Sequence, residues 1–309
     1  MKTVVLHIGY PKTGTSSLQW FLHTHREALR EQGVCYPVTG QAADHAHHKL
    51  AFSLRDNNYE QWSEAQRIQL FADLDAEILA SDADTLVLSS ELFLDALDHI
   101  RTSKEFERIL HGRALRVICF LRKQSTFLES LYRQFIWDTT HRLTDQPDVF
   151  LTRYPWVGDY HAVLTRWAAF AGTENIEPVV YEQARNAGGC IRRFCTLLGV
   201  DTRTLPDADF DAAKNLLPVT TLATEIMRLS NGYDGLSIEQ RHELARHARR
   251  FAESIDHLPL PARLFSDAHI AQVESMYRES NRKLAQDFVH QSLAGFWFQE
   301  QLAETVPSA

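Results

Sequence analysis

The sequence has few of the features that mark a secreted, membrane-spanning or zinc-bound protein. Only four of its 309 residues are cysteines, and none forms a CxxC pair, which excludes a zinc ribbon and a redox dithiol motif. No run of 18 apolar residues occurs, and Lys12 interrupts the first apolar run too early for a secretory signal. We therefore expect a cytoplasmic protein with reduced cysteines and no membrane span.

An excess of positive charge is also missing. The formal net charge is −8 at pH 7, from 32 Lys and Arg residues against 40 Asp and Glu residues. Proteins that bind nucleic acid neutralise its backbone with clustered positive charge, so this balance argues against a nucleic-acid partner. Any basic patch must therefore be local. Apolar residues make up 44% of the chain, which is ample for a hydrophobic core.

Strand-like and helix-like segments alternate through the first 180 residues. This alternation predicts an α/β fold of three layers, a parallel sheet with helices on both faces. From residue 191 onward the pattern is almost entirely helical. We expect a single domain, 1–309, whose helical C-terminal part from about residue 200 is not independent. The expected strands are 3–9, 33–37, 84–90, 113–122 and 176–182, and the expected helices include 16–30, 60–80, 125–138 and 161–171.

The most informative stretch is YPKTGTSS, residues 10–17, between the first expected strand and the first expected helix. Free N–H groups and the helix dipole favour an anion at a helix N-terminus, and Lys12 adds a full positive charge. The stretch is not a Walker A motif, because its lysine precedes the glycine. We predict a loop that holds a phosphate-like anion; the alternative is an ordinary turn capped by Thr15 or Ser16.

Two other expected strands also end in functional side chains. Arg122 ends the strand 113–122, and Ser130 follows two turns into the next helix, so both are candidates to bind one phosphate. Glu91 follows the strand 84–90, where a carboxylate is either a general base or a helix N-terminal acid. Because ligands bind outside the carboxyl ends of parallel strands, we expect these side chains at one edge of the sheet.

Together these motifs resemble the sulfotransferases that use 3′-phosphoadenosine 5′-phosphosulfate (PAPS), especially bacterial and carbohydrate-type members. YPKTGTSS resembles their 5′-phosphosulfate loop. Arg122 and Ser130 have the spacing of their 3′-phosphate motif, and the run Ser-x-Tyr-x-Gln from Ser130 strengthens the match. Tyr181, in VVYEQ, resembles the tyrosine near the adenine. The Arg-Lys-Gly loop of cytosolic members is missing, and Lys214 and Asn215 are the nearest candidates for its role.

The resemblance implies a P-loop NTPase-like sulfotransferase fold, PAPS as donor and the bisphosphate PAP as product. It implies no metal, and an acceptor hydroxyl on a small molecule or glycan, most naturally a carbohydrate or glycolipid. In this reading Lys12 stabilises the leaving group; the oligomeric state is left open. The donor-binding residues carried over are Pro11, Lys12, Thr13, Gly14, Thr15, Ser16, Arg122, Ser130 and Tyr181.

The acceptor hydroxyl needs a base, and Glu91 is the first candidate. Its rival is His48, in the cluster of Asp44, His45, His47 and His48, because a neutral imidazole is a good base near pH 7. The cluster can also be read as solvent-exposed histidines, or as a metal site with poor chelating spacing. Two alternative functions remain: an ATP-dependent small-molecule kinase, which predicts magnesium and a lysine where Thr15 stands, and a non-catalytic nucleotide-binding protein.

Overall fold

The computed structural model describes residues 2–55, 61–205, 220–255, 257–259 and 261–288. Lys214 and Asn215, the candidates for a second 3′-phosphate contact, lie outside these residues. The chain divides into two compact units, each described by itself. Unit 1 comprises Met1–Arg122, Tyr160–Lys214 and Arg282–Ala309, and unit 2 comprises Lys123–Asp159 and Asn215–Asn281. The chain therefore passes from unit 1 into unit 2 and back twice.

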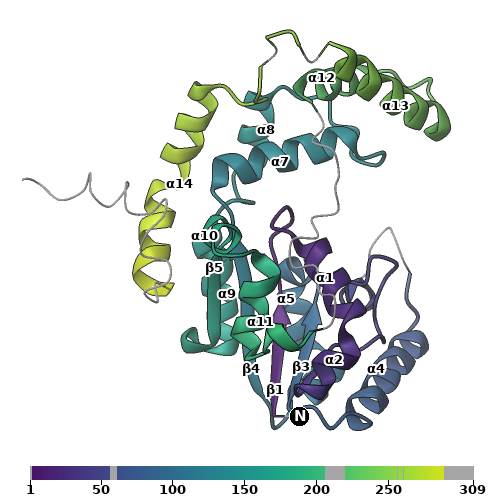
Figure 1. Cartoon of the computed structure of the whole chain (residues 1–309), viewed down its shortest axis with the longest axis vertical. Helices are drawn as coiled ribbons and strands as arrows, with labels where there is room; N and C mark the ends of the chain where they lie inside the picture. Colours follow the sequence, from purple (N-terminus) through teal and green to yellow (C-terminus); the bar gives the residue numbers. More distant parts are fainter. Residues whose placement is uncertain (1, 56–60, 206–219, 256, 260, 289–309) are drawn as a thin grey trace, which may run out of the picture. The chain divides into compact units, whose positions relative to one another are not determined.

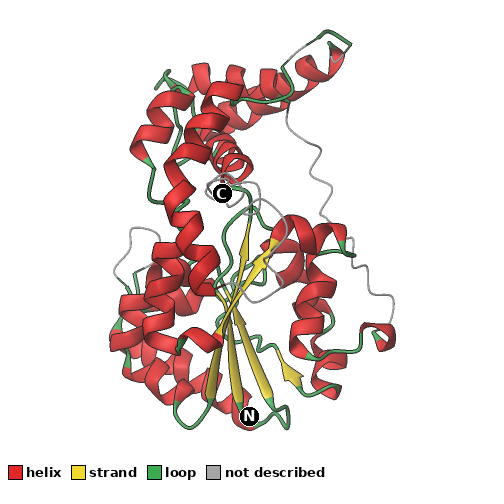
Figure 2. Ribbon diagram, turned by 90° about the vertical axis from the view of Figure 1, so that its left-hand side faces the viewer, coloured by secondary structure: helices red, strands yellow, loops and turns green. Residues whose placement is uncertain are grey.

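Unit 1 contains a five-stranded sheet in which every pair of neighbours is parallel (Figure 2). The strand order is β2-β3-β1-β4-β5, with β1 in the centre. His7, at the end of β1, lies in register with Ser89 of β3 and Ile118 of β4. The predicted α/β class with a parallel sheet is confirmed. The strands are β1 (Thr3–His7), β2 (Val34–Cys35), β3 (Thr85–Ser89), β4 (Ala114–Leu121) and β5 (Ile176–Val180).

Helices cover both faces of this sheet (Figures 1 and 2). On one face Val5, Val87 and Ile118 form a buried core with side chains of α1, α2, α10 and α11. On the other, α9 packs on β4 and β5, and α5 packs on α9. The helices of unit 1 are α1 (Thr15–Thr24), α2 (Arg26–Glu31), α3 (His48–Ser53), α4 (Glu64–Leu79), α5 (Phe93–Thr102), α6 (Lys104–Leu110), α9 (Tyr160–Ala171), α10 (Tyr181–Asn186) and α11 (Cys190–Leu198), with short 3₁₀ turns at Thr173–Asn175 and Thr202–Thr204.

The helix expected over 16–30 is two helices. His25, between α1 and α2, has φ −100° and ψ 16°, which interrupts the helical backbone. Phe21 of α1 and Leu29 of α2 nevertheless reach the same buried core. Apolar spacing alone predicted both core contacts, but it did not predict the break between them.

Unit 2 is helical. Its α7 packs against α12, and the Trp137 indole donates to the Thr224 hydroxyl at 3.2 Å. The buried Arg241 guanidinium donates to Asn231 Oδ1, which ties α13 to the end of α12. Among the described helices, none has the length and apolarity needed to cross a membrane. The helices are α7 (Gln124–Trp137), α8 (Pro147–Arg153), α12 (Thr221–Asn231) and α13 (Ile238–Ser254), while α14 (Asp267–Phe288) begins in unit 2 and ends in unit 1.

Candidate active site

The loop between β1 and α1 has an unusual backbone. Gly14, the N-cap of α1, lies in the left-handed region at φ 83°, and Lys12 has φ 68°. A positive φ is uncommon for a residue with a side chain, and such conformations concentrate at functional sites. Two hydrogen bonds stabilise the conformation of this loop. The Lys12 carbonyl accepts from Arg122 Nη1 at 2.9 Å, and the Thr13 hydroxyl donates to the Tyr10 carbonyl at 2.6 Å.

This loop presents the N-terminus of α1 without a side-chain cap among the described residues. The first helical bond runs from the Leu18 N–H to the Gly14 carbonyl, so the preceding N–H groups of α1 have no acceptor within the helix. A Cβ added at Gly14 would meet no atom within 4 Å. Lys12 and Ser16 are exposed on the same loop, which therefore offers backbone N–H groups, hydroxyls and one ammonium to an anion.

Gly9 lets the loop approach the sheet closely. A Cβ at this position would lie 2.7 Å from Thr15 Cγ2 and 2.9 Å from two atoms of the His7 ring. No side chain fits in that space without moving its neighbours. Gly9 therefore sets the distance between the end of β1 and the start of α1.

Arg122 follows β4, the strand beside β1. Besides its bond to the Lys12 carbonyl, its guanidinium lies 5.4 Å from the centre of the Tyr181 ring at the end of β5. The Tyr160 hydroxyl donates to the Arg122 carbonyl at 2.6 Å. The chain leaves β1 and β4 toward opposite edges of the sheet, so the loop and Arg122 meet at a topological switch point, where α/β proteins bind ligands.

Ser130, the other expected 3′-phosphate ligand, lies on α7 in unit 2 and is half-buried. Arg122 belongs to unit 1. The pairing of these two residues on one phosphate stays a prediction.

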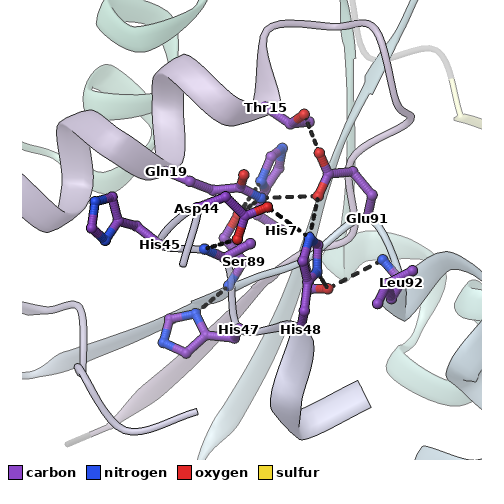
Figure 3. Close-up of polar contacts among 12 residues, drawn as sticks. His7, Thr15, Gln19, Asp44, His45, His47, His48, Ser89, Glu91 and Leu92 are labelled. Carbon is purple, nitrogen blue, oxygen red and sulfur yellow. Dashed lines mark hydrogen bonds and ion pairs between the residues drawn. The ribbon is translucent and has the colours of Figure 1, made fainter. Parts of the chain in front are cut away.

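Glu91 follows β3, the strand on the other side of β1, and its side chain is 18% exposed. One carboxylate oxygen, Oε1, accepts a hydrogen bond from the Thr15 hydroxyl, and the other, Oε2, accepts from Gln19 Nε2 at 3.1 Å (Figure 3). Thr15 and Gln19 are four residues apart and so lie on the same face of α1. The helix that begins at the loop therefore holds both oxygens of Glu91.

His48, the first residue of α3, lies between two carboxylates. Its Nε2 is 3.2 Å from Asp44 Oδ2 and 3.8 Å from Glu91 Oε2. Carboxylates only accept, so Nε2 carries a proton, and this hydrogen bond holds the pKa of Asp44 below its usual range. Nδ1 lies 2.7 Å from the Ser90 hydroxyl, which also accepts from the Leu92 N–H at 3.2 Å. Both ring nitrogens of His48 therefore have a polar partner beside Glu91.

The other histidines of the cluster have different surroundings. His47 is buried rather than solvent-exposed: its Nδ1 accepts from the Ser89 N–H at 3.1 Å, and its Nε2 donates to the Pro37 carbonyl at 2.9 Å. Burial lowers the pKa of His47 to about 4. The His45 ring stacks on His23 at 3.8 Å. Within the described part of the chain, no group of three or more His, Cys, Asp or Glu side chains is arranged to hold a metal ion.

Three residues around Glu91 were not expected from the sequence. Gln19, Ser89 and His7 are all buried and connect Glu91 to the interior of unit 1. One available signal was the four-residue spacing of Thr15 and Gln19, which places a second polar side chain on the face of α1 that begins at the loop. His7 and Ser89 lie within apolar strands, where nothing in the sequence pairs them.

Comparison with known proteins gives distant similarities. No protein-family model matches the chain. An uncharacterised protein of Archaeoglobus fulgidus is 27% identical over 204 residues, which are 66% of this chain and 53% of that protein, so the chain spans about half the length of this relative. A sulfotransferase from Alicyclobacillus acidocaldarius has a similar structure, with a TM-score of 0.43 and 16% identity over 84% of this chain and 98% of that one. At these levels neither protein assigns a family or an activity.

Proposed function

We propose that the protein is a sulfotransferase that moves the sulfuryl group of PAPS to a hydroxyl of an acceptor. One observation carries the proposal: the ends of three adjacent strands bring a carboxylate, an anion-binding loop and an arginine to one edge of the sheet. These are Glu91 after β3, Lys12 after β1 and Arg122 after β4. The carboxylate would act as a base for the acceptor hydroxyl, and the loop would bind the anionic donor without the lysine of a Walker A motif. This combination suits the transfer of a sulfuryl group.

The residues around the loop fit such a donor. Lys12 and the first N–H groups of α1 would bind the 5′-phosphosulfate, together with Pro11, Thr13, Gly14, Thr15 and Ser16. Arg122 would bind the 3′-phosphate with Ser130, and Tyr181, whose ring faces Arg122, would lie near the adenine. The open space at Gly14 and the exposure of Lys12 leave the loop accessible to a ligand.

In the proposed reaction the acceptor O–H bond breaks and its proton passes to a Glu91 oxygen. The acceptor oxygen forms a bond to sulfur, the bond from sulfur to the bridging oxygen of the donor breaks, and its electron pair remains on the 5′-phosphate. Lys12 and the α1 N–H groups face the charge that grows there. Loss of one preorganised donor of this kind typically costs a factor of about 10²–10³ in rate. No metal is part of the proposal.

The acceptor is proposed to be a carbohydrate or glycolipid, by the resemblance of the motifs to carbohydrate-type sulfotransferases. A sugar hydroxyl has a high pKa and so requires a base, which Glu91 supplies. We assign the base to Glu91 rather than to His48, because Glu91 directly follows β3 and its two oxygens accept from Thr15 and Gln19 of the helix that begins at the loop.

The test of donor identity is a thermal-shift comparison. The bisphosphate PAP in EDTA should stabilise the protein by about 2.7 kcal/mol at 100 times its Kd, whereas ATP with magnesium should not. Arg122→Ala should abolish this shift. Arg116→Ala is the matched control, because Arg116 lies on the same strand and donates to the Leu197 carbonyl away from the loop.

The alternatives give different results. Stabilisation only by ATP with magnesium would identify a kinase and overturn the proposal. Stabilisation by PAP, without sulfate transfer to any member of a broad acceptor panel, would favour a non-catalytic nucleotide-binding protein. An equal loss of the PAP effect in Arg122→Ala and Arg116→Ala would remove Arg122 from the donor site.

A further inference from the structure

A chain of buried polar groups leads from Glu91 into the sheet. Gln19 Nε2 lies 3.1 Å from Glu91 Oε2 and 3.2 Å from the Ser89 hydroxyl. The Ser89 hydroxyl lies 2.7 Å from His7 Nδ1. Gln19, Ser89 and His7 are each at most 1% exposed, so water does not compete for these bonds. The chain is only partly satisfied, because Gln19 Oε1 and His7 Nε2 are buried without a hydrogen-bond partner within the ranges that the structure describes.

One donor in this chain is fixed by its chemistry. The two N–H bonds of the Gln19 amide are directed to the Glu91 carboxylate and to the Ser89 oxygen. The Ser89 hydroxyl keeps its own proton and a second lone pair for the contact with His7 Nδ1. Burial lowers the pKa of His7 to about 4, so His7 is neutral at physiological pH.

The opposite orientation of the Gln19 amide is unfavourable. Its carbonyl oxygen would then face the Glu91 carboxylate, and two acceptors would meet in a buried site. In the observed orientation the amide donates to Glu91 and thereby favours the ionised carboxylate, the form that takes up a proton.

From this geometry we propose that Gln19 is a positioning residue for the Glu91 base. Its amide donates to one carboxylate oxygen and holds it in place, while the Thr15 hydroxyl holds the other oxygen. The inference rests on the proposed function only in giving Glu91 a catalytic role. The arrangement of Gln19, Ser89 and His7 is independent of the donor and the acceptor.

Other titratable groups also surround Glu91. His48 from α3 lies 3.8 Å away, and Asp44 from the preceding loop lies behind His48. His7 on β1 and Tyr36 after β2 interact with the Glu91 charge through space. A test must therefore remove the Gln19 donor while these four groups stay unchanged.

The first experiment follows the Glu91 carboxyl carbon by ¹³C NMR between pH 3 and pH 8, with its signal assigned as the one missing in Glu91→Gln. Gln19→Met keeps the length of the side chain and removes the donor. We expect the Glu91 carboxyl to titrate at a higher pH in this variant than in the wild type, because a hydrogen bond to the charged form is lost. Gln19→Asn, one methylene shorter, should move the midpoint of the Glu91 titration in the same direction if the methionine variant does not fold.

Gln124→Met is the matched control. Gln124 is a buried amide on α7 whose Nε2 donates to Asn281 Oδ1 at 2.6 Å, in unit 2. The Gln124→Met substitution should lower the stability of the protein without moving the midpoint of the Glu91 titration. An unchanged midpoint in Gln19→Met, or the same move in Gln124→Met, would overturn the inference.

A rate measurement separates positioning from general stability. Where PAPS turnover is measured, Gln19→Met should lower kcat by about 10-fold or more, move the acidic limb of the pH profile upward and leave PAP binding unchanged. In a Glu91→Gln background the same substitution should have no further effect, because the residue acts through Glu91. If PAP does not bind at all, the proposed function fails; if PAP binds and the Glu91 midpoint stays fixed, only the role of Gln19 fails.

Discussion

At the scale of single residues, Glu91 and His48 are neighbours with different contacts. Both carboxylate oxygens of Glu91 accept from side chains of α1, whereas His48 Nε2 lies 3.2 Å from Asp44 Oδ2 and 3.8 Å from Glu91 Oε2. We propose Glu91 as the base because it is the residue held directly against the loop and helix that follow β1.

Substitution of these two residues should therefore give unequal losses. Glu91→Gln should lower the rate of sulfate transfer by about 10²–10⁴, because the general base is lost. His48→Ala should lower it by a smaller factor. The transfer rates of both variants are measured as release of PAP from PAPS in the presence of a panel of glycan acceptors. The PAP thermal shift is the control for donor binding. Near-normal turnover in Glu91→Gln would contradict the assignment of the base.

The sequence allowed prediction of the polar side chains that follow the strand ends. Lys12, Arg122 and Glu91 stand out because polar side chains follow apolar strands, and the structure places all three at one edge of the sheet. Gln19 and Ser89 were missed for a physical reason. Inside a helix or strand a single polar residue gives no sign of its partner, which here comes from a segment about 70 residues away.

At the scale of elements, the strand, loop and helix from β1 to α1 form a tightly fitted unit. Gly9 lies against the His7 ring and the Thr15 methyl, while Gly14 opens toward free space. The two glycines therefore serve different purposes. Gly9 permits a close approach, and Gly14 permits a left-handed backbone at the start of α1.

Substitution of Gly9 tests whether the close approach is required. Gly9→Ala should destabilise the protein by about 1–3 kcal/mol through overpacking and should weaken PAP binding, because the loop must move. Gly33→Ala, where φ is 81° with open space around it, is the control for backbone strain outside the loop. Urea unfolding and PAP titration measure both variants. Equal PAP affinity in Gly9→Ala and the wild type would show that the loop tolerates the displacement.

Prediction of the elements succeeded where apolar periodicity was strong and failed where it was interrupted. Strands β1, β3, β4 and β5 lie where they were expected, because runs of β-branched residues leave little choice. No glycine or proline marks the break between α1 and α2 at His25. The apolar positions Phe21 and Leu29 have the spacing of one continuous helix, so the linear pattern gives no sign of the break.

At the scale of the whole molecule, two buried histidines make stability depend on pH. Burial lowers the pKa of His7 and of His47 to about 4, from an ordinary value of about 6.5. Between these values the unfolded chain binds protons that the folded chain does not. Stability is therefore complete above about pH 6.5 and falls as the pH decreases toward 4.

The expected slope is up to roughly 1.4 kcal/mol per pH unit for each histidine. Urea unfolding between pH 7.5 and pH 5 measures it, and His47→Gln should reduce the slope by about half. The exposed His247, substituted in the same way, should leave the slope unchanged. A slope that is the same in the wild type and His47→Gln would contradict the assignment of a neutral His47.

The passage of the chain between the units also sets an order of events on the ribosome. The sheet has all of its strands once Val180 has emerged, but α7 packs against α12, which ends at Asn231, roughly 90 residues after α7. At about 5–20 residues per second, the interval is roughly 5–20 s. During that time α7, which buries Leu128, Leu131 and Ile136 in the finished protein, lacks one of the helices that pack against it, so we expect the nascent α7 to be an early target for a chaperone that binds apolar helices.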